Sequence, residues 1–210
     1  MSGDVFSQRF SGIERLYGKS FTQSLIHRHV AVAGLGGVGS WAAEALVRSG
    51  MGAVTLIDLD EVCLSNTNRQ LHTLQDTIGQ PKTEVMARRL RAINPDCQVE
   101  TRMHFVTAGN VDSVVSREFD ALVDAIDSVR HKAALLAHCR RHKIWVICAG
   151  GAGGQTDPTR IRVVDLSRST QDPLLAKVRN LLRREYGFSR NPKRRFEIPA
   201  IYSDEQLVYP

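Results

Sequence analysis

Two patterns of apolar residues alternate along this chain, one typical of buried strands and the other typical of helices. The run at residues 30–33 contains β-branched side chains and is typical of a strand buried on both faces of a parallel sheet. Small apolar residues at 42–47 predict a helix that packs close to that sheet. A second apolar run at 54–57 predicts a strand that ends at Asp58.

The same alternation continues to about residue 182. It predicts helices over 11–26 (one or two), 82–93, 107–116, 129–142 and from 172 onward, and strands over 97–102, 121–127, 144–148 and 160–166. Strands that alternate with helices indicate the α/β class, with a doubly wound, mostly parallel Rossmann-like sheet and helices on both faces. Beyond Gly150 the alternation weakens, which predicts additional antiparallel C-terminal strands and a basic helix.

The domain organisation follows from these elements. We expect an N-terminal helical segment at 1–28, a Rossmann-like domain at 29–166 and a basic C-terminal extension at 167–210. A length of 210 residues is enough for one large domain with an appendage.

A glycine-rich turn joins the first predicted strand to the first predicted helix of this domain. Glycines allow the backbone to turn tightly and approach a phosphate, and the following helix N-terminus offers free N–H groups to it. Asp58 follows Gly34 by 58 − 34 = 24 residues, a spacing that allows it to bind a ribose hydroxyl. The pattern predicts a nucleotide site and leaves NAD, FAD and ATP open. The glycines concerned are Gly34, Gly36, Gly37 and Gly39.

Composition restricts the class of protein further. Hydrophobic residues make up 42% and charged residues 24% of the chain, which is ordinary for a globular protein. No apolar run reaches the roughly 18 residues that span a membrane, and no signal-peptide pattern is seen, so we expect a cytoplasmic location. The four cysteines form no C-x-x-C pair, so we expect neither zinc nor disulfides, and Cys97, Cys139 and Cys148 are expected to be buried thiols.

Positive charge is concentrated near the C-terminal end. Residues 168–195 contain nine cations and two acids, a balance of 9 − 2 = +7, whereas the whole chain carries +6. Such a segment is typical of either a nucleic-acid-binding surface or a solvated helix face, and composition alone leaves both open.

Taken together, these residues resemble the ubiquitin-activating-like adenylyltransferase superfamily. The resemblance is carried by the glycine turn, Asp58, and residues 65–66, 69–70, 82 and 124–127. It implies that the glycine turn and Asp58 bind ATP, with Gly36 and Gly39 near the phosphates. It also implies that Asp127 holds Mg²⁺ and that the remaining ATP contacts come from Asn66, Arg69, Gln70 and Lys82.

The implied chemistry agrees with these residue types. In adenylation a carboxylate attacks the α-phosphorus and pyrophosphate leaves, so charge builds on phosphoryl oxygens. Arg69 can grip such oxygens with two N–H groups, while Lys82 supplies a point charge. Catalytic roles are therefore expected for Arg69, Lys82 and Asp127. An NAD-dependent oxidoreductase would not need this set, which makes it the weaker alternative.

Within that superfamily the chain is most similar to the tRNA threonylcarbamoyladenosine dehydratase family. The resemblance implies that ATP activates the threonyl carboxylate of the modified adenosine beside the anticodon, and that ring closure then releases AMP. Activation of a ubiquitin-like sulfur-carrier protein is the alternative, although paired cysteines and a transfer cysteine are missing at the expected places. The similar stretches are residues 9–12, 15–18, 36–46, 66–70, 124–129, 132–133, 150–155 and 157–159.

The resemblance also implies partners. A tRNA bearing threonylcarbamoyladenosine would bind the basic extension through Arg183, Arg184, Arg190, Lys193, Arg194 and Arg195. A homodimer is expected, in which Arg15 reaches the partner's ATP site and has a catalytic role, and a sulfur-transfer or redox protein is a further expected partner. Family members continue beyond the position of Pro210, so the basic extension is predicted to be truncated relative to them. Ala200 stands where the resemblance leads us to expect a cysteine, which argues against a mechanism that requires a downstream thiol.

Overall fold

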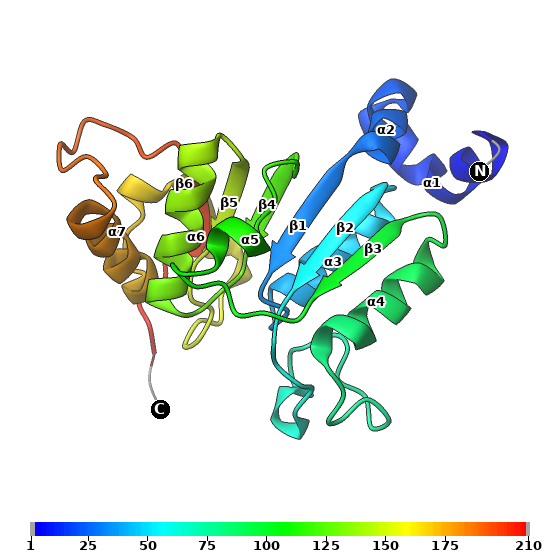
Figure 1. Ribbon diagram of the computed structural model, residues 1–210, viewed down its shortest axis with the longest axis horizontal. Helices are drawn as coiled ribbons and strands as arrows, with labels where there is room; N and C mark the ends of the chain where they lie inside the picture. The colour runs from blue at the N-terminus through cyan, green and yellow to red at the C-terminus, as the bar shows by residue number, and fades with distance from the viewer. Residues whose placement is uncertain (1–2, 209–210) are drawn as a thin grey trace. The chain divides into compact units, whose positions relative to one another are not determined.

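A computed structural model describes residues 3–208, with side chains from residue 5 onward. The chain forms two compact parts. The first part comprises the residues up to 105 together with 118–120, and the second part comprises 106–117 and the residues from 121 onward. Figure 1 shows the helices and strands of each part.

The first part is built on three parallel strands in the order β3-β2-β1. Helix α3 packs against β1 and β2, and α4 packs against β2, β3 and α3. The elements are α1 (Gly3–Tyr17), α2 (Lys19–Ser24), the 3₁₀ turn η1 (Leu25–His27), β1 (His29–Ala33), α3 (Gly39–Arg48), β2 (Ala53–Ile57), η2 (Leu64–Asn66), α4 (Lys82–Ile93) and β3 (Gln98–Arg102).

Burial explains why these segments form. In β1 and β2 every residue after the first is buried, as the continuous apolar runs predict for strands covered on both faces. Gly52 is required just before β2, because a Cβ atom there would lie 1.8 Å from the carbonyl oxygen of Ile26.

The second part contains β4, β5 and β7 as parallel neighbours, with β6 antiparallel at the edge beside β7. Helix α6 packs on α7, β4 and β5, and α5 packs on α6. The elements are α5 (Val111–Val114), β4 (Ala121–Asp124), α6 (Val129–His142), β5 (Trp145–Ala149), η3 (Pro158–Arg160), β6 (Ile161–Asp165), η4 (Leu166–Arg168), α7 (Pro173–Glu185) and β7 (Pro199–Ser203).

The predicted α/β class with mostly parallel strands is confirmed, including the antiparallel addition after Gly150. Three predicted elements differ in extent by more than one residue at an end. Helix α5 begins only at Val111, because Asn110 Oδ1 accepts hydrogen bonds from Thr107 and closes a turn there. Strand β4 ends at Asp124, where Oδ1 accepts the Ile126 N–H. Helix α1 extends to Gly3, with Phe6 and Phe10 buried. The domain boundaries at 28 and 166 stay predictions.

Cys97, Cys139 and Cys148 are buried, as predicted. Burial raises the pKa of the Cys97 thiol to about 11 and those of Cys139 and Cys148 to about 12, so all three stay protonated near neutral pH.

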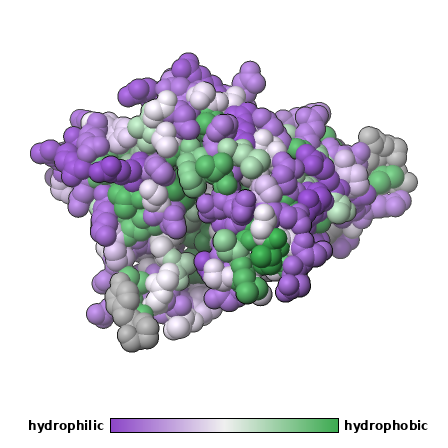
Figure 2. Space-filling model, turned by 60° about the horizontal axis from the view of Figure 1, so that its bottom comes forward, coloured by the Kyte–Doolittle hydropathy of each residue, from purple (hydrophilic) through white to green (hydrophobic). Residues whose placement is uncertain are grey.

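Among the described helices, none is long and apolar enough to cross a membrane. On the face drawn in Figure 2, hydrophobic side chains lie among a larger number of hydrophilic ones.

Candidate active site

The end of β1 is joined to the end of β2 through Asp58. One carboxylate oxygen of Asp58 accepts the Leu35 N–H at 2.6 Å, and the other accepts the Asp60 N–H at 2.8 Å. Burial raises the pKa of Asp58, and the two N–H donors and the charge of Lys82 oppose that rise. Gly34 adopts a φ of 87°, which favours glycine, at the first residue of the turn. The predicted acid therefore lies against the predicted glycine turn.

The backbone at Gly36, just before α3, borders open space. A Cβ atom at Gly36 would meet no atom of the described chain within 4 Å. Gly39 is buried at the first position of α3, where backbone N–H groups lack partners within the helix. Open space at a helix N-terminus suits an anionic group such as a phosphate.

Arg69 packs over this turn. Its side chain lies 3.2 Å from the position of a Cβ atom at Gly37, and its carbonyl oxygen accepts a hydrogen bond from Trp41 Nε1 at 3.1 Å. The exposed guanidinium donates to Ser65 O at 3.2 Å and to Asn68 Oδ1 at 2.9 Å. The structure thus brings Arg69 and the glycine turn together, as the predicted site requires.

Asn66 and Gln70 lie in the same segment and are both buried. Asn66 Oδ1 accepts the Cys63 N–H at 3.2 Å, so this side chain also closes the η2 turn. Gln70 Oε1 has no hydrogen-bond partner among the described residues. Such an orphaned buried acceptor is typical of a site that receives a polar ligand.

Lys82 is buried at the start of α4, with 5% of its surface exposed. Its ammonium group donates to Asp60 Oδ2 at 2.9 Å, and Asp60 itself is exposed. His72 is buried nearby, and burial, followed by the charge of Lys82, lowers the pKa of His72 to about 4. Sequence reasoning missed His72, because nothing in the pattern distinguishes it from an exposed loop histidine.

The second part contains Asp127, the predicted Mg²⁺ ligand. Asp127 is exposed in the loop between β4 and α6, and its carboxylate makes no hydrogen bond or ion pair within residues 3–208. A carboxylate without a protein partner fits the oxygen donors that Mg²⁺ prefers.

Asp124, three residues earlier, is fully buried and pairs with Lys132 at 2.9 Å. Lys132 Nζ also donates to the carbonyl oxygens of Asp124 and Ile126. Burial raises the pKa of Asp124, and the Lys132 ammonium opposes that rise. The ion pair and the two carbonyl contacts hold the loop that carries Asp127, so the role of Lys132 is structural.

The remaining predicted residues lie on other elements. Arg15 is exposed on α1. In the basic extension Arg184, Arg190, Lys193, Arg194 and Arg195 are exposed. Arg183 is half-buried over the ring of Phe196, at 5.3 Å from its centre, and donates to Ser189 O.

A strand-end acid bound to a glycine turn, with Arg69 packed over that turn, defines a nucleotide-binding protein of the α/β class. The ThiF family model matches residues 10–184, and the chain belongs to that family. Its place within the family is that of the tRNA threonylcarbamoyladenosine dehydratases. It is 52% identical over 207 residues to the enzyme of that name from Haemophilus influenzae, covering 99% of this chain and 79% of that protein. The Escherichia coli enzyme is 53% identical, with 99% and 77% covered.

A comparison with solved structures indicates the same family. The chain matches the E. coli tRNA N6-threonylcarbamoyladenosine dehydratase in complex with ATP with a TM-score of 0.97 and 52% identity, covering 100% of this chain and 86% of that chain. The E. coli sulfur carrier protein ThiS adenylyltransferase is 34% identical over 135 residues, covering 63% of this chain and 53% of that protein. The predicted family is therefore confirmed, and the sulfur-carrier and NAD alternatives are less well supported.

Proposed function

We propose that this protein is an ATP-dependent tRNA threonylcarbamoyladenosine dehydratase. The observation that carries ATP binding is the open space at Gly36 beside the Asp58–Leu35 hydrogen bond. The tRNA substrate is supported by two relatives that are 52% and 53% identical to this chain and are named tRNA threonylcarbamoyladenosine dehydratase.

The proposed reaction has two steps. The threonyl carboxylate of the modified adenosine attacks the α-phosphorus of ATP, and pyrophosphate leaves. Intramolecular attack on the acyl-adenylate then closes a ring and expels AMP, with a net loss of one water. Asp58 would bind the ribose, and backbone N–H groups at the start of α3 would bind phosphate oxygens.

Lys82 and Arg69 would stabilise charge in the first step. The buried Lys82 ammonium is held in one orientation by Asp60, so little reorganisation is needed when phosphoryl charge develops. Asp127 would hold Mg²⁺, which supplies neutralisation of phosphate charge when bound.

The test is AMP formation from ATP and Mg²⁺ with threonylcarbamoyl-modified tRNA, unmodified tRNA or no acceptor. We expect AMP only with modified tRNA, together with a tRNA nucleoside that is lighter by one water. AMP formation with a ubiquitin-like carrier protein, and none with any tRNA, would instead indicate the sulfur-carrier alternative.

Arg69→Ala should lower the rate of adenylation by about a hundredfold or more, and weaken ATP binding much less. The reason is that the contact strengthens as charge develops on the phosphoryl oxygens. Single-turnover rates and ATP titrations separate the two effects. Equal losses in rate and in affinity would make Arg69 a ground-state binding residue. Arg88→Ala, on the exposed face of α4, is the matched control.

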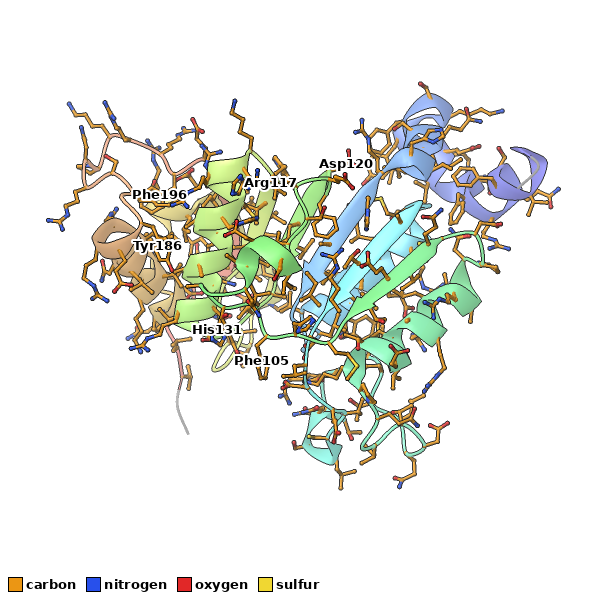
Figure 3. All side chains as sticks on the ribbon, in the orientation of Figure 1. Phe105, Arg117, Asp120, His131, Tyr186 and Phe196 are labelled. Carbon is orange, nitrogen blue, oxygen red and sulfur yellow. The ribbon has the colours of Figure 1, made fainter. Side chains whose placement is uncertain are left out.

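The basic extension is proposed as the tRNA-binding surface. Two cavities, of about 390 and 440 Å³, lie along α6 and α7, the second also against the turn at 107–109, and Arg130 and Arg184 line both. Figure 3 marks His131 on α6, Tyr186 at the end of α7 and Phe196 in the segment that follows α7. The ring of Phe196 packs edge-on against the ring of Phe188, with 4.9 Å between the two ring centres. This contact anchors the segment at 189–195, which carries the exposed cations. Phosphate contacts of this kind position a nucleic acid without reading its sequence.

The double change Arg194→Ser and Arg195→Ser should weaken tRNA binding and flatten its salt dependence. Each lost phosphate contact is expected to reduce the slope of log K against log salt by about 0.7 to 0.9. Binding isotherms at several salt concentrations measure this slope. Lys19→Ser, which removes a cation from α2, should leave the slope as it is; an unchanged slope in the double variant would assign Arg194 and Arg195 to a solvated surface.

We also propose a homodimer and a cytoplasmic location. Helices α1 and α2 expose the apolar side chains of Leu16, Tyr17 and Phe21, with 70%, 60% and 51% of their surfaces accessible. An exposed apolar cluster of this kind favours contact with another protein surface. A trans role for Arg15, on the same helix, and a sulfur-transfer or redox partner stay predictions.

A further inference from the structure

Two histidines and an aspartate converge at the contact between α5 and α6, and none of the three has been assigned a role above. His138 and His142 are four residues apart on α6, so their side chains lie on one face of that helix. Their ring centres are 4.5 Å apart. Asp112 projects from α5 toward both rings: its Oδ1 lies 3.2 Å from His138 Nδ1 and 3.6 Å from His142 Nε2.

We propose that Asp112, His138 and His142 form a binding site for Zn²⁺. One ligand atom from each residue lies within 4.8 Å of the others. Tetrahedral Zn²⁺ with bonds of about 2.0 to 2.1 Å places its ligand atoms about 3.3 Å apart. The two separations from Asp112 bracket that value, and the ligand atoms of the two imidazoles lie within 4.8 Å of each other, so ligation requires the two rings to move slightly.

The donor set specifies the kind of cation. Two imidazoles and one carboxylate suit Zn²⁺, whereas Mg²⁺ and Ca²⁺ prefer oxygen ligands alone. Three protein ligands leave a fourth position for water, and Asp112 has 72% of its side chain exposed, so solvent can reach the ion. The expectation of no zinc rested on missing cysteine pairs, and this site uses none.

Burial supplies a second observation. His138 is 6% exposed, so its ring is held in place with Nδ1 facing Asp112. A Zn²⁺ bond to that nitrogen would fasten the four-residue helix α5 to α6.

The experiment uses full-length protein without a histidine tag, stripped of metal with a chelator and titrated with Zn²⁺ by calorimetry. We expect one Zn²⁺ per chain and a melting temperature that rises with Zn²⁺, because the ion binds only the folded chain. Replacement by Co²⁺ should give the visible absorption of a tetrahedral site without the thiolate band that binding at the exposed Cys63 would add.

Three variants separate this site from others. Asp112→Asn and His142→Gln change exposed or half-buried side chains, so both should fold, and each should lower Zn²⁺ affinity at least about tenfold. His104→Gln, which changes an exposed histidine on another segment, should bind Zn²⁺ like the unaltered protein. Failure to bind Zn²⁺, or equal affinity in all three variants, would overturn the proposal. None of these readouts depends on the dehydratase reaction.

Discussion

Gly36→Val should lower the affinity for ATP at least about a hundredfold, or about 3 kcal/mol, while leaving the fold intact. The described chain has no atom within 4 Å of a Cβ at this position, so the added side chain meets no protein group. The backbone there is also not in the left-handed region that restricts other residues to glycine. The isopropyl group would instead fill the space that the proposal assigns to phosphate.

ATP titration by calorimetry, with thermal melting in parallel, measures both quantities. Gly109→Ala is the control, because Gly109 lies in an exposed turn where a Cβ meets only one atom, at 3.9 Å. Unchanged ATP affinity in Gly36→Val would place the phosphates elsewhere. A large fall in melting temperature would show that the space at Gly36 is needed for packing.

Lys132→Met should destabilise the protein by about 3 to 5 kcal/mol, because it leaves the Asp124 carboxylate buried without its counter-charge. Both side chains are fully buried, so water cannot replace the lost partner. Urea denaturation at pH 7 measures the free energy of unfolding.

The double variant Asp124→Asn with Lys132→Met is the control for this prediction. It removes both charges and retains a side-chain oxygen that can accept the Ile126 N–H, so it should recover much of the lost stability. In Lys132→Met the pKa of Asp124 stays above its unfolded value, and the folded state therefore binds the extra proton more readily. Its deficit should be largest at neutral pH and shrink as pH falls toward about 4. A deficit that is independent of pH would indicate a packing defect rather than an unpaired charge.

The periodic elements could be predicted from the sequence because their signals are local. The bounds of α4 and α6 coincide with the predicted ranges, β1 and β2 each begin one residue earlier than predicted, and β5 is shifted by one residue toward the C-terminus. Errors arose where a single side chain overrode the apolar pattern. Asn110 closes a turn that delays α5, and Asp124 closes the turn that ends β4.

Some residues of the candidate sites could likewise be predicted from the sequence, and others could not. The glycine turn, Asp58, Arg69 and Lys82 could be selected from residue type and spacing, since a phosphate-binding turn is a contiguous motif. His72 could not, because its lowered pKa comes from burial and from the charge of Lys82, ten residues away. Nor could the cluster of Asp112, His138 and His142, because Asp112 meets the histidines only through the packing of α5 on α6.

The sequence by itself determined the α/β class, the order of the elements and the nucleotide-binding turn. These depend on side-chain periodicity and on backbone freedom at glycine, which are properties of neighbouring residues. Only the tertiary structure decided which polar side chains are buried and which groups face them. Lys132 and Arg183 are cations in the sequence, but the fold makes one a buried partner of Asp124 and lays the other over Phe196. The physical reason is that burial and charge pairing depend on contacts between segments that are far apart along the chain.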